Sequence, residues 1–243
     1  MRNGFTLAEV LVTLGIIGIV AAMTLPAVVN KYREKVFITA AKRGYSNVVN
    51  AINRWNADNS IVGDYSFYFS SNNNNGLAIE LAKKLNAVKV CTNSQVKNCG
   101  GAYKVKRATK TNNGKGETAV NTVMNANRIV LSDGSFIAVQ TEVQNGSCTH
   151  TYWSYERDTN GNFIEDSSSP NGFKGQYKTS SNCGFIHIDT NGLKGPNQIG
   201  RDNFVIGFYP YKIYSRSDVY GNLDYVLAND KLIETEQYEI GKY

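Results

Sequence analysis

The chain has few of the side chains from which active sites are built. Among its 243 residues there are two histidines, His150 and His187, and these alone suit general base chemistry near neutral pH. The sequence contains no Gly-x-Ser-x-Gly, His-Glu-x-x-His, P-loop or dinucleotide-binding glycine motif. We therefore expect no enzymatic activity.

Charged residues are also scarce. They make up 19% of the chain, whereas Asn, Ser, Thr, Gly and Tyr are abundant, a composition that favours an extracytoplasmic surface. The formal net charge is +6, and a basic surface could attract DNA or an anionic membrane. Lys and Arg are scattered, however, with no basic run and no basic stripe interleaved with aromatic residues. The pattern favours an ordinary solvated surface, with DNA binding as the weaker alternative.

Charge is absent altogether from a stretch near the N-terminus. The twenty residues from Val10 to Val29 carry none, and at about 1.5 Å per residue a helix of this length reaches the roughly 30 Å of a hydrocarbon core. One carboxylate, Glu9, stands at its front edge, where it is costly unless a cation meets it. A cut after Gly4 would give Phe5 an α-amine one helical turn away. Glu9 is therefore a candidate functional residue.

The segment Gly4-Phe5-Thr6-Leu7-Ala8-Glu9, followed by the apolar run, resembles the cleavage and methylation segment of type IV prepilins and type II secretion pseudopilins. The resemblance covers about the first thirty residues. It implies that a prepilin peptidase removes the leader and N-methylates Phe5, and that Glu9 pairs with the terminal amine of an adjacent subunit during assembly. It also implies a bacterial inner-membrane protein with an extracytoplasmic head, later part of a pilus or a periplasmic pseudopilus. Pro26 falls where pilins often have a helix-disturbing proline.

Two other interpretations of the N-terminus stay open. A secretory signal peptide would use Arg2 as its charged region and Ala21-Ala22 as its cleavage site, but Glu9 interrupts that pattern. A plain transmembrane anchor would leave Glu9 without a role. The sequence thus admits two classes of function: a filament subunit, or a membrane-anchored binding module or adhesin that works alone. Cleavage after Gly4 separates them, because only a subunit requires it.

Beyond Pro26 the pattern becomes amphipathic, with apolar residues at steps of three to five that are typical of one helical face. These residues are Tyr32, Phe37, Ala41, Tyr45, Val48, Ile52 and Trp55. The sequence therefore predicts one helix from about Thr6 to about Asn56, able to bend or unwind near Pro26. We expect three parts: a leader over 1–4, a transmembrane or filament-core helix over 5–29, and the amphipathic half of the helix with a globular head over 30–243.

Strand signals begin at Arg128 and favour a hairpin around the turn Ser132-Asp133-Gly134-Ser135, followed by two more apolar runs. The predicted strands are 129–131, 136–140, 185–189 and 204–209. Short helices are expected near 77–85 and 223–232. The predicted fold class is α+β and pilin-like, with the long N-terminal helix packed on a four-stranded antiparallel sheet.

Four cysteines fit an oxidising compartment: Cys91, Cys99, Cys148 and Cys183. Three connectivities are open, and the order along the chain favours disulfides from Cys91 to Cys99 and from Cys148 to Cys183. A competing interpretation places zinc between the second pair of cysteines and the two histidines, but this spacing fits no known zinc motif.

The tetrapeptide Asp-Thr-Asn-Gly occurs twice, at 158–161 and 189–192. In the second copy Asp189 and Asn191, with Asp202 further on, could supply oxygen ligands for calcium. The match to an EF-hand loop is partial, because Gly comes at the fourth position and no Glu closes the loop. Asx turns are the ordinary explanation of this pattern. The resemblance adds that some pseudopilins hold calcium in a comparable loop.

Overall fold

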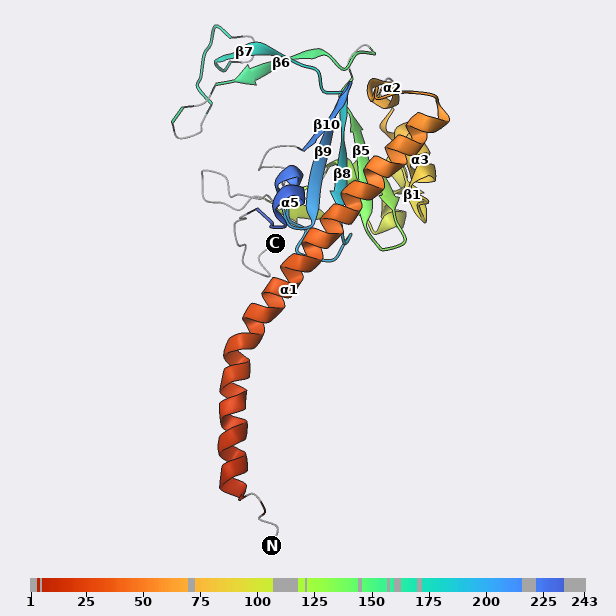
Figure 1. The fold of residues 1–243 in the computed structure, drawn as a ribbon. Coiled ribbons are helices and arrows are strands. Elements are labelled where there is room, and N and C mark those ends of the chain that lie inside the picture. The colour runs from red at the N-terminus through yellow and green to blue at the C-terminus, as the bar shows by residue number, and fades with distance from the viewer. Residues whose placement is uncertain are drawn as a thin grey trace.

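The structure, a computed structural model, describes residues 4, 6–69, 73–106, 118–120, 122–143, 146–156, 158–159, 163–169, 172–215 and 222–233. One long helix, α1 (Leu7–Asp58), carries a head at its C-terminal end (Figure 1). The helix remains helical through Pro26, and Figure 1 shows it bent below the head rather than unwound. The predicted helix is thus confirmed, with its C-terminal end two residues later than expected.

The head covers only part of α1. Every residue from 7 to 36 is exposed, and the helix becomes partly covered from Phe37 onward. Ala41, Val48 and Ile52 are buried as the periodicity predicts, whereas Tyr32 is 69% exposed because it lies below the head. The head-facing stripe also contains Gly44, where an added Cβ would come within 2.9 Å of Ile188 Cγ2. A glycine there allows the helix to approach the sheet closely.

The head is built on an antiparallel sheet of order β1-β4-β5-β8-β9-β10. Its strands are β1 (Lys89–Cys91), β4 (Arg128–Val130), β5 (Phe136–Thr141), β8 (Gly184–Asp189), β9 (Asn203–Tyr209) and β10 (Lys212–Ser215). The α+β class is confirmed, and the four predicted strands form the centre of the sheet. The sheet is wider than expected by β1 and β10, which are short edge strands with lysines and therefore give a weak apolar signal.

The main core lies between α1 and one face of the sheet. It includes Ile137, Val139, Ile186, Ile188 and Ile206, which alternate with residues of the opposite face along their strands. Helices α2 (Ser66–Phe69), α3 (Asn74–Lys84) and α5 (Leu223–Asn229) complete this layer. On the opposite face a smaller cluster joins Phe136 and Ala138 to Met124 of α4 (Thr122–Ala126).

Both predicted disulfides are present. Cys91–Cys99 joins β1 to the end of a 3-10 helix, η1 (Asn93–Cys99), and Cys148–Cys183 ties two points just before β6 (His150–Tyr155) and β8. The second bridge uses both sulfurs that the zinc interpretation requires. Two further strands, β2 (Lys104–Lys106) and β3 (Thr118–Val120), form a small separate ladder.

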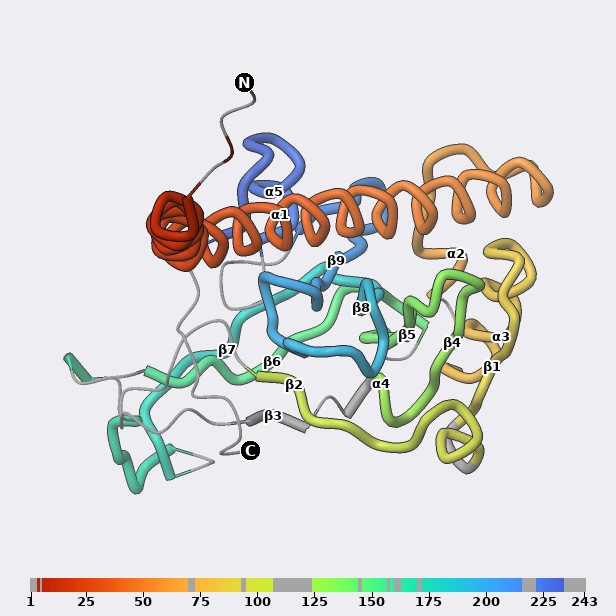
Figure 2. The backbone as a smooth tube through the Cα atoms, turned by 90° about the horizontal axis from the view of Figure 1, so that it is seen from below, coloured from red at the N-terminus to blue at the C-terminus, as the bar shows by residue number. Residues whose placement is uncertain are grey.

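The described residues between the second pair of cysteines, 148–156, 158–159, 163–169 and 172–183, form an arm. Among the described strands, β6 and β7 (Gly175–Ser180) pair only with each other, from His150 opposite Ser180 to Tyr155 opposite Gly175. Figures 1 and 2 show this hairpin projecting from the side of the head that lies away from α3 and β1.

Candidate functional site

The first turn of α1 is a capping box. The Glu9 backbone N–H donates to Thr6 Oγ1 at 3.3 Å, and Glu9 Oε2 accepts from the Thr6 backbone N–H at 2.8 Å and from its hydroxyl at 2.9 Å. The Thr-x-x-Glu spacing is a local sequence signal for such a helix start. Glu9 therefore begins the helix as well as standing at the front of the apolar run.

The processing residues flank this turn. Gly4 has open surroundings: apart from its own atoms and those of its chain neighbours, no heavy atom of the described residues lies within 4 Å of the place where a Cβ would stand. Phe5, the predicted mature N-terminus, lies outside the described residues. Within the described part of the chain Glu9 forms no ion pair, so one copy offers this carboxylate only its capping contacts.

The segment behind Glu9 is suited to an apolar environment. Among the described residues, α1 is the one helix long and apolar enough to cross a membrane, and none of its apolar window is buried by the head. The hydroxyls of Thr13 and Thr24 donate back to the carbonyls of Glu9 and Val20, both at 2.9 Å. Because these polar groups are satisfied within the helix, the segment leaves little for water to solvate.

The predicted calcium loop connects β8 to β9 and buries both of its aspartates. Asp189 Oδ1 accepts from the backbone N–H groups of Asn191 at 3.2 Å and Gly192 at 2.8 Å, which forms an Asx turn. Asp189 Oδ2 accepts from the Tyr103 hydroxyl at 2.7 Å and from Asn203 Nδ2 at 3.0 Å. Both oxygens of this carboxylate are thus already used by protein donors.

Asp202 is held in the same way. Its carboxylate accepts from the backbone N–H groups of Asn197 at 2.8 Å and Gln198 at 2.7 Å, and Asn203 Nδ2 lies 3.3 Å from Oδ1. The amide of Asn203 therefore lies between the two carboxylates. Burial and the neighbouring charge of Asp202 raise the pKa of Asp189 to about 7, and burial also raises the pKa of Asp202.

This geometry favours the Asx-turn explanation of the loop over calcium. The described residues contain no group of three or more His, Cys, Asp or Glu side chains that could hold a metal ion. One observation favours a cation: the amide oxygens of Asn191 and Asn197 are buried without a hydrogen-bond partner. The first Asp-Thr-Asn-Gly copy lies partly outside the described residues, so calcium there stays a prediction, as it does at 189–202.

Sequence reasoning missed one buried charged residue, Arg128, at the start of β4. Its guanidinium lies 5.1 Å from the Tyr103 ring centre and 4.7 Å from that of Phe136, and it donates to the carbonyl oxygens of Cys99 and Gly101. It therefore holds the Cys91–Cys99 loop against the sheet. An arginine at the edge of a predicted strand resembles a surface residue, and no local signal marks it as buried.

Comparison with known proteins identifies the N-terminal segment. Residues 1–25 match the family model described as the prokaryotic N-terminal methylation motif. Among curated proteins and solved structures, no match to the chain was found. The chain therefore carries a prokaryotic N-terminal methylation motif of the prepilin type, placed at the start of a long helix whose apolar half is exposed.

Proposed function

We propose that this protein is a structural subunit, a pilin or pseudopilin, of a type IV pilus or type II secretion filament. A prepilin peptidase cuts the chain after Gly4 and methylates Phe5, and the mature subunit assembles through α1. The methylation motif at residues 1–25 carries the proposal. The proposed role is structural, without enzymatic activity.

The exposed half of α1 supports assembly through this helix. Each large apolar side chain removed from water contributes about 1.5–3 kcal/mol, and the head covers none of those between Leu7 and Val29. Inner-membrane lipid covers them before assembly, and the helices of other pilin or pseudopilin subunits cover them afterwards. The head, with its two disulfides, then lies on the extracytoplasmic side.

Glu9 supplies the register between subunits. Among the described residues of one copy its carboxylate contacts only Thr6, and we propose that the cation comes from another copy. The α-amine of Phe5 in a neighbouring copy meets that need, and the pairing is stronger in an apolar surrounding than in water.

The alternative function is a membrane-anchored binding module that never enters a filament. The two functions differ in the mature N-terminus, which mass spectrometry of the purified protein reads directly. We expect a chain that begins with N-methyl-Phe5, and an uncut chain in Gly4→Val. Purified protein that keeps Met1, or that is cut near Ala22, would contradict the proposal.

A further inference from the structure

The end of the arm is aromatic and exposed. Trp153 packs on Tyr177 with ring centres 4.9 Å apart, and Tyr155 packs on Phe163 at 5.1 Å. These contacts stabilise a two-stranded hairpin that would be marginal alone. Even so, Tyr177 stays 65% exposed, Tyr155 42% and Phe163 41%. Such a cluster of exposed aromatic rings marks an interaction surface.

The same end of the arm is acidic. Glu165 and Asp166 follow Phe163, and the Asp166 carboxylate accepts from the backbone N–H of Ser168 at 3.0 Å and from its hydroxyl at 2.6 Å, which holds the turn. Glu165 is exposed and forms no ion pair within the described residues. The sequence from residue 148 to residue 183 contains four acidic and three basic residues in a chain of net charge +6, so this segment is acidic against a basic remainder.

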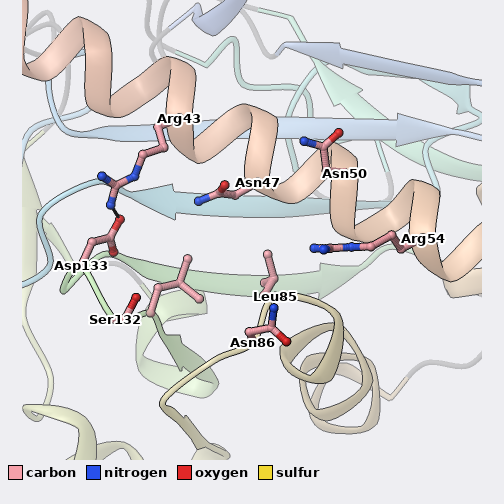
Figure 3. Close-up of a pocket in the computed structure, with 9 residues that line it drawn as sticks. Arg43, Asn47, Asn50, Arg54, Leu85, Asn86, Ser132 and Asp133 are labelled. Atoms are coloured by element: carbon pink, nitrogen blue, oxygen red, sulfur yellow. Dashed lines mark hydrogen bonds and ion pairs between the residues drawn. The ribbon is translucent and has the colours of Figure 1, made fainter.

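A groove that contains two arginines lies beside α1, with a volume of about 400 Å³ (Figure 3). One wall is a polar stripe of the helix, since steps of four, three and four residues place its members on one face. The stripe consists of Arg43, Asn47, Asn50 and Arg54. The other wall comes from Leu85 and Asn86 after α3 and from residues 131–133 before β5.

The groove carries an uncompensated positive charge. Arg43 pairs with Asp133. Arg54 donates to the Lys84 carbonyl at 2.7 Å and has no carboxylate partner among the described residues. Figure 3 shows the Arg54 side chain lying along the groove above Leu85. The groove thus offers a guanidinium held in place beside one partly exposed apolar side chain, Leu85.

We propose that this groove receives the acidic, aromatic end of the arm from a second copy of the chain. The Arg54 guanidinium binds the Glu165 carboxylate, and the rings of Phe163 and Tyr155 pack against the partly exposed Leu85. A planar guanidinium suits a carboxylate, and buried aromatic residues are typical anchors of protein interfaces. This inference rests on the proposed function, because a filament brings copies side by side.

The contact joins different surfaces of the two copies. Figures 1 and 2 place the arm on one side of the head and α3, whose end lines the groove, on the other. After one contact forms, the copy that supplied its arm still has an unoccupied groove, and the copy that supplied its groove still has an unoccupied arm. Such a head-to-tail interface continues from copy to copy instead of closing on itself.

The test is a photo-cross-link in the full chain, in host membranes or detergent micelles. A benzophenone amino acid in place of Phe163 should give a dimer band, and mass spectrometry should join position 163 to a peptide that contains 43–54, 84–86 or 131–133. Arg54→Glu and Glu165→Arg should each lower the dimer yield about tenfold by placing like charges together. Lys194→Glu, an exposed charge change outside the groove, should leave the yield unchanged.

Mixing the two charge-reversed variants provides the decisive experiment. Arg54→Glu keeps the native arm and Glu165→Arg keeps the native groove, so these two surfaces can form the native contact. The altered groove and the altered arm are also complementary in charge, so the mixture should regain the dimer yield. Cross-links only to other surfaces or other proteins, or a mixture as poor as the single variants, would overturn the contact. The N-terminal residue is determined by mass spectrometry in the same samples. A chain that starts at Phe5 but lacks the cross-link would contradict only this inference. A chain that keeps Met1 would contradict the proposed function.

Discussion

Glu9 has an observed capping role and a proposed assembly role at one position. Its carboxylate caps the first turn of α1 by accepting from Thr6, and it stands at the front of an exposed apolar helix. A glutamine at the same position could make the capping contacts but carries no charge. The two roles can therefore be separated by substitution.

We predict that Glu9→Leu is cleaved and inserted in the membrane but enters filaments poorly, because it cannot pair with a neighbour's amine. Glu9→Gln should be equally deficient, since charge and not capping is the missing property. The measurement is the fraction of subunits in sheared filaments against the fraction left in the membrane. Normal incorporation of Glu9→Gln would show that Glu9 serves only as a cap.

Residue-scale prediction succeeds where the signal is local. The assembly role of Glu9 stays a prediction, whereas the cysteine pairs and the buried helix positions Val48 and Ile52 follow from spacing along the chain. Arg128 does not, because its burial depends on the rings of Tyr103 and Phe136, which come from different elements.

The loop between β8 and β9 is the element whose sequence admits two explanations. Asp189 and Asp202 receive backbone N–H donors from within the loop, so internal hydrogen bonds can order it without an ion. Ordering a loop that contains several Gly and Asn residues costs conformational entropy, which these bonds help to offset. An ion would have to displace some of these donors.

We therefore predict that the melting temperature of the full chain in detergent is the same in excess calcium and in excess chelator. If calcium bound the folded chain, a free calcium concentration of about 100 times the Kd would add about 2.7 kcal/mol to the free energy of unfolding. The melting temperature would then rise by several degrees. Near-UV circular dichroism gives the measurement. A chelator-sensitive melting temperature that is lost in Asp189→Ala would instead establish the calcium site.

At the scale of the whole molecule, the stability of the head is linked to the protonation of Asp189. Burial and Asp202 raise its folded pKa to about 7, above the unfolded value of about 3.9. A raised pKa means that the folded state binds the proton more tightly. The resulting stabilisation is complete below pH about 4 and is lost as the pH rises through about 7.

We predict that the free energy of unfolding of the wild type falls relative to that of Asp189→Asn between pH 4 and 7, by on the order of 2–4 kcal/mol. Asparagine keeps the shape of the side chain and the two hydrogen bonds that Oδ1 accepts, although its Nδ2 cannot accept from Tyr103 or Asn203, and it does not titrate. Urea unfolding at a series of pH values supplies the comparison. Parallel pH profiles for the two proteins would assign the pH dependence to other groups.

The sequence by itself determined the N-terminal segment, the length of α1, the four central strands and both disulfides. Each of these features follows from a local pattern along the chain: a motif, a helical or strand periodicity, or the spacing of cysteines. Only the tertiary structure decided that the head stops short of Tyr32, that Gly44 meets Ile188, and that Arg54 faces Leu85 across a groove. Each of these depends on which distant segments the packing brings together, and no local pattern encodes that choice.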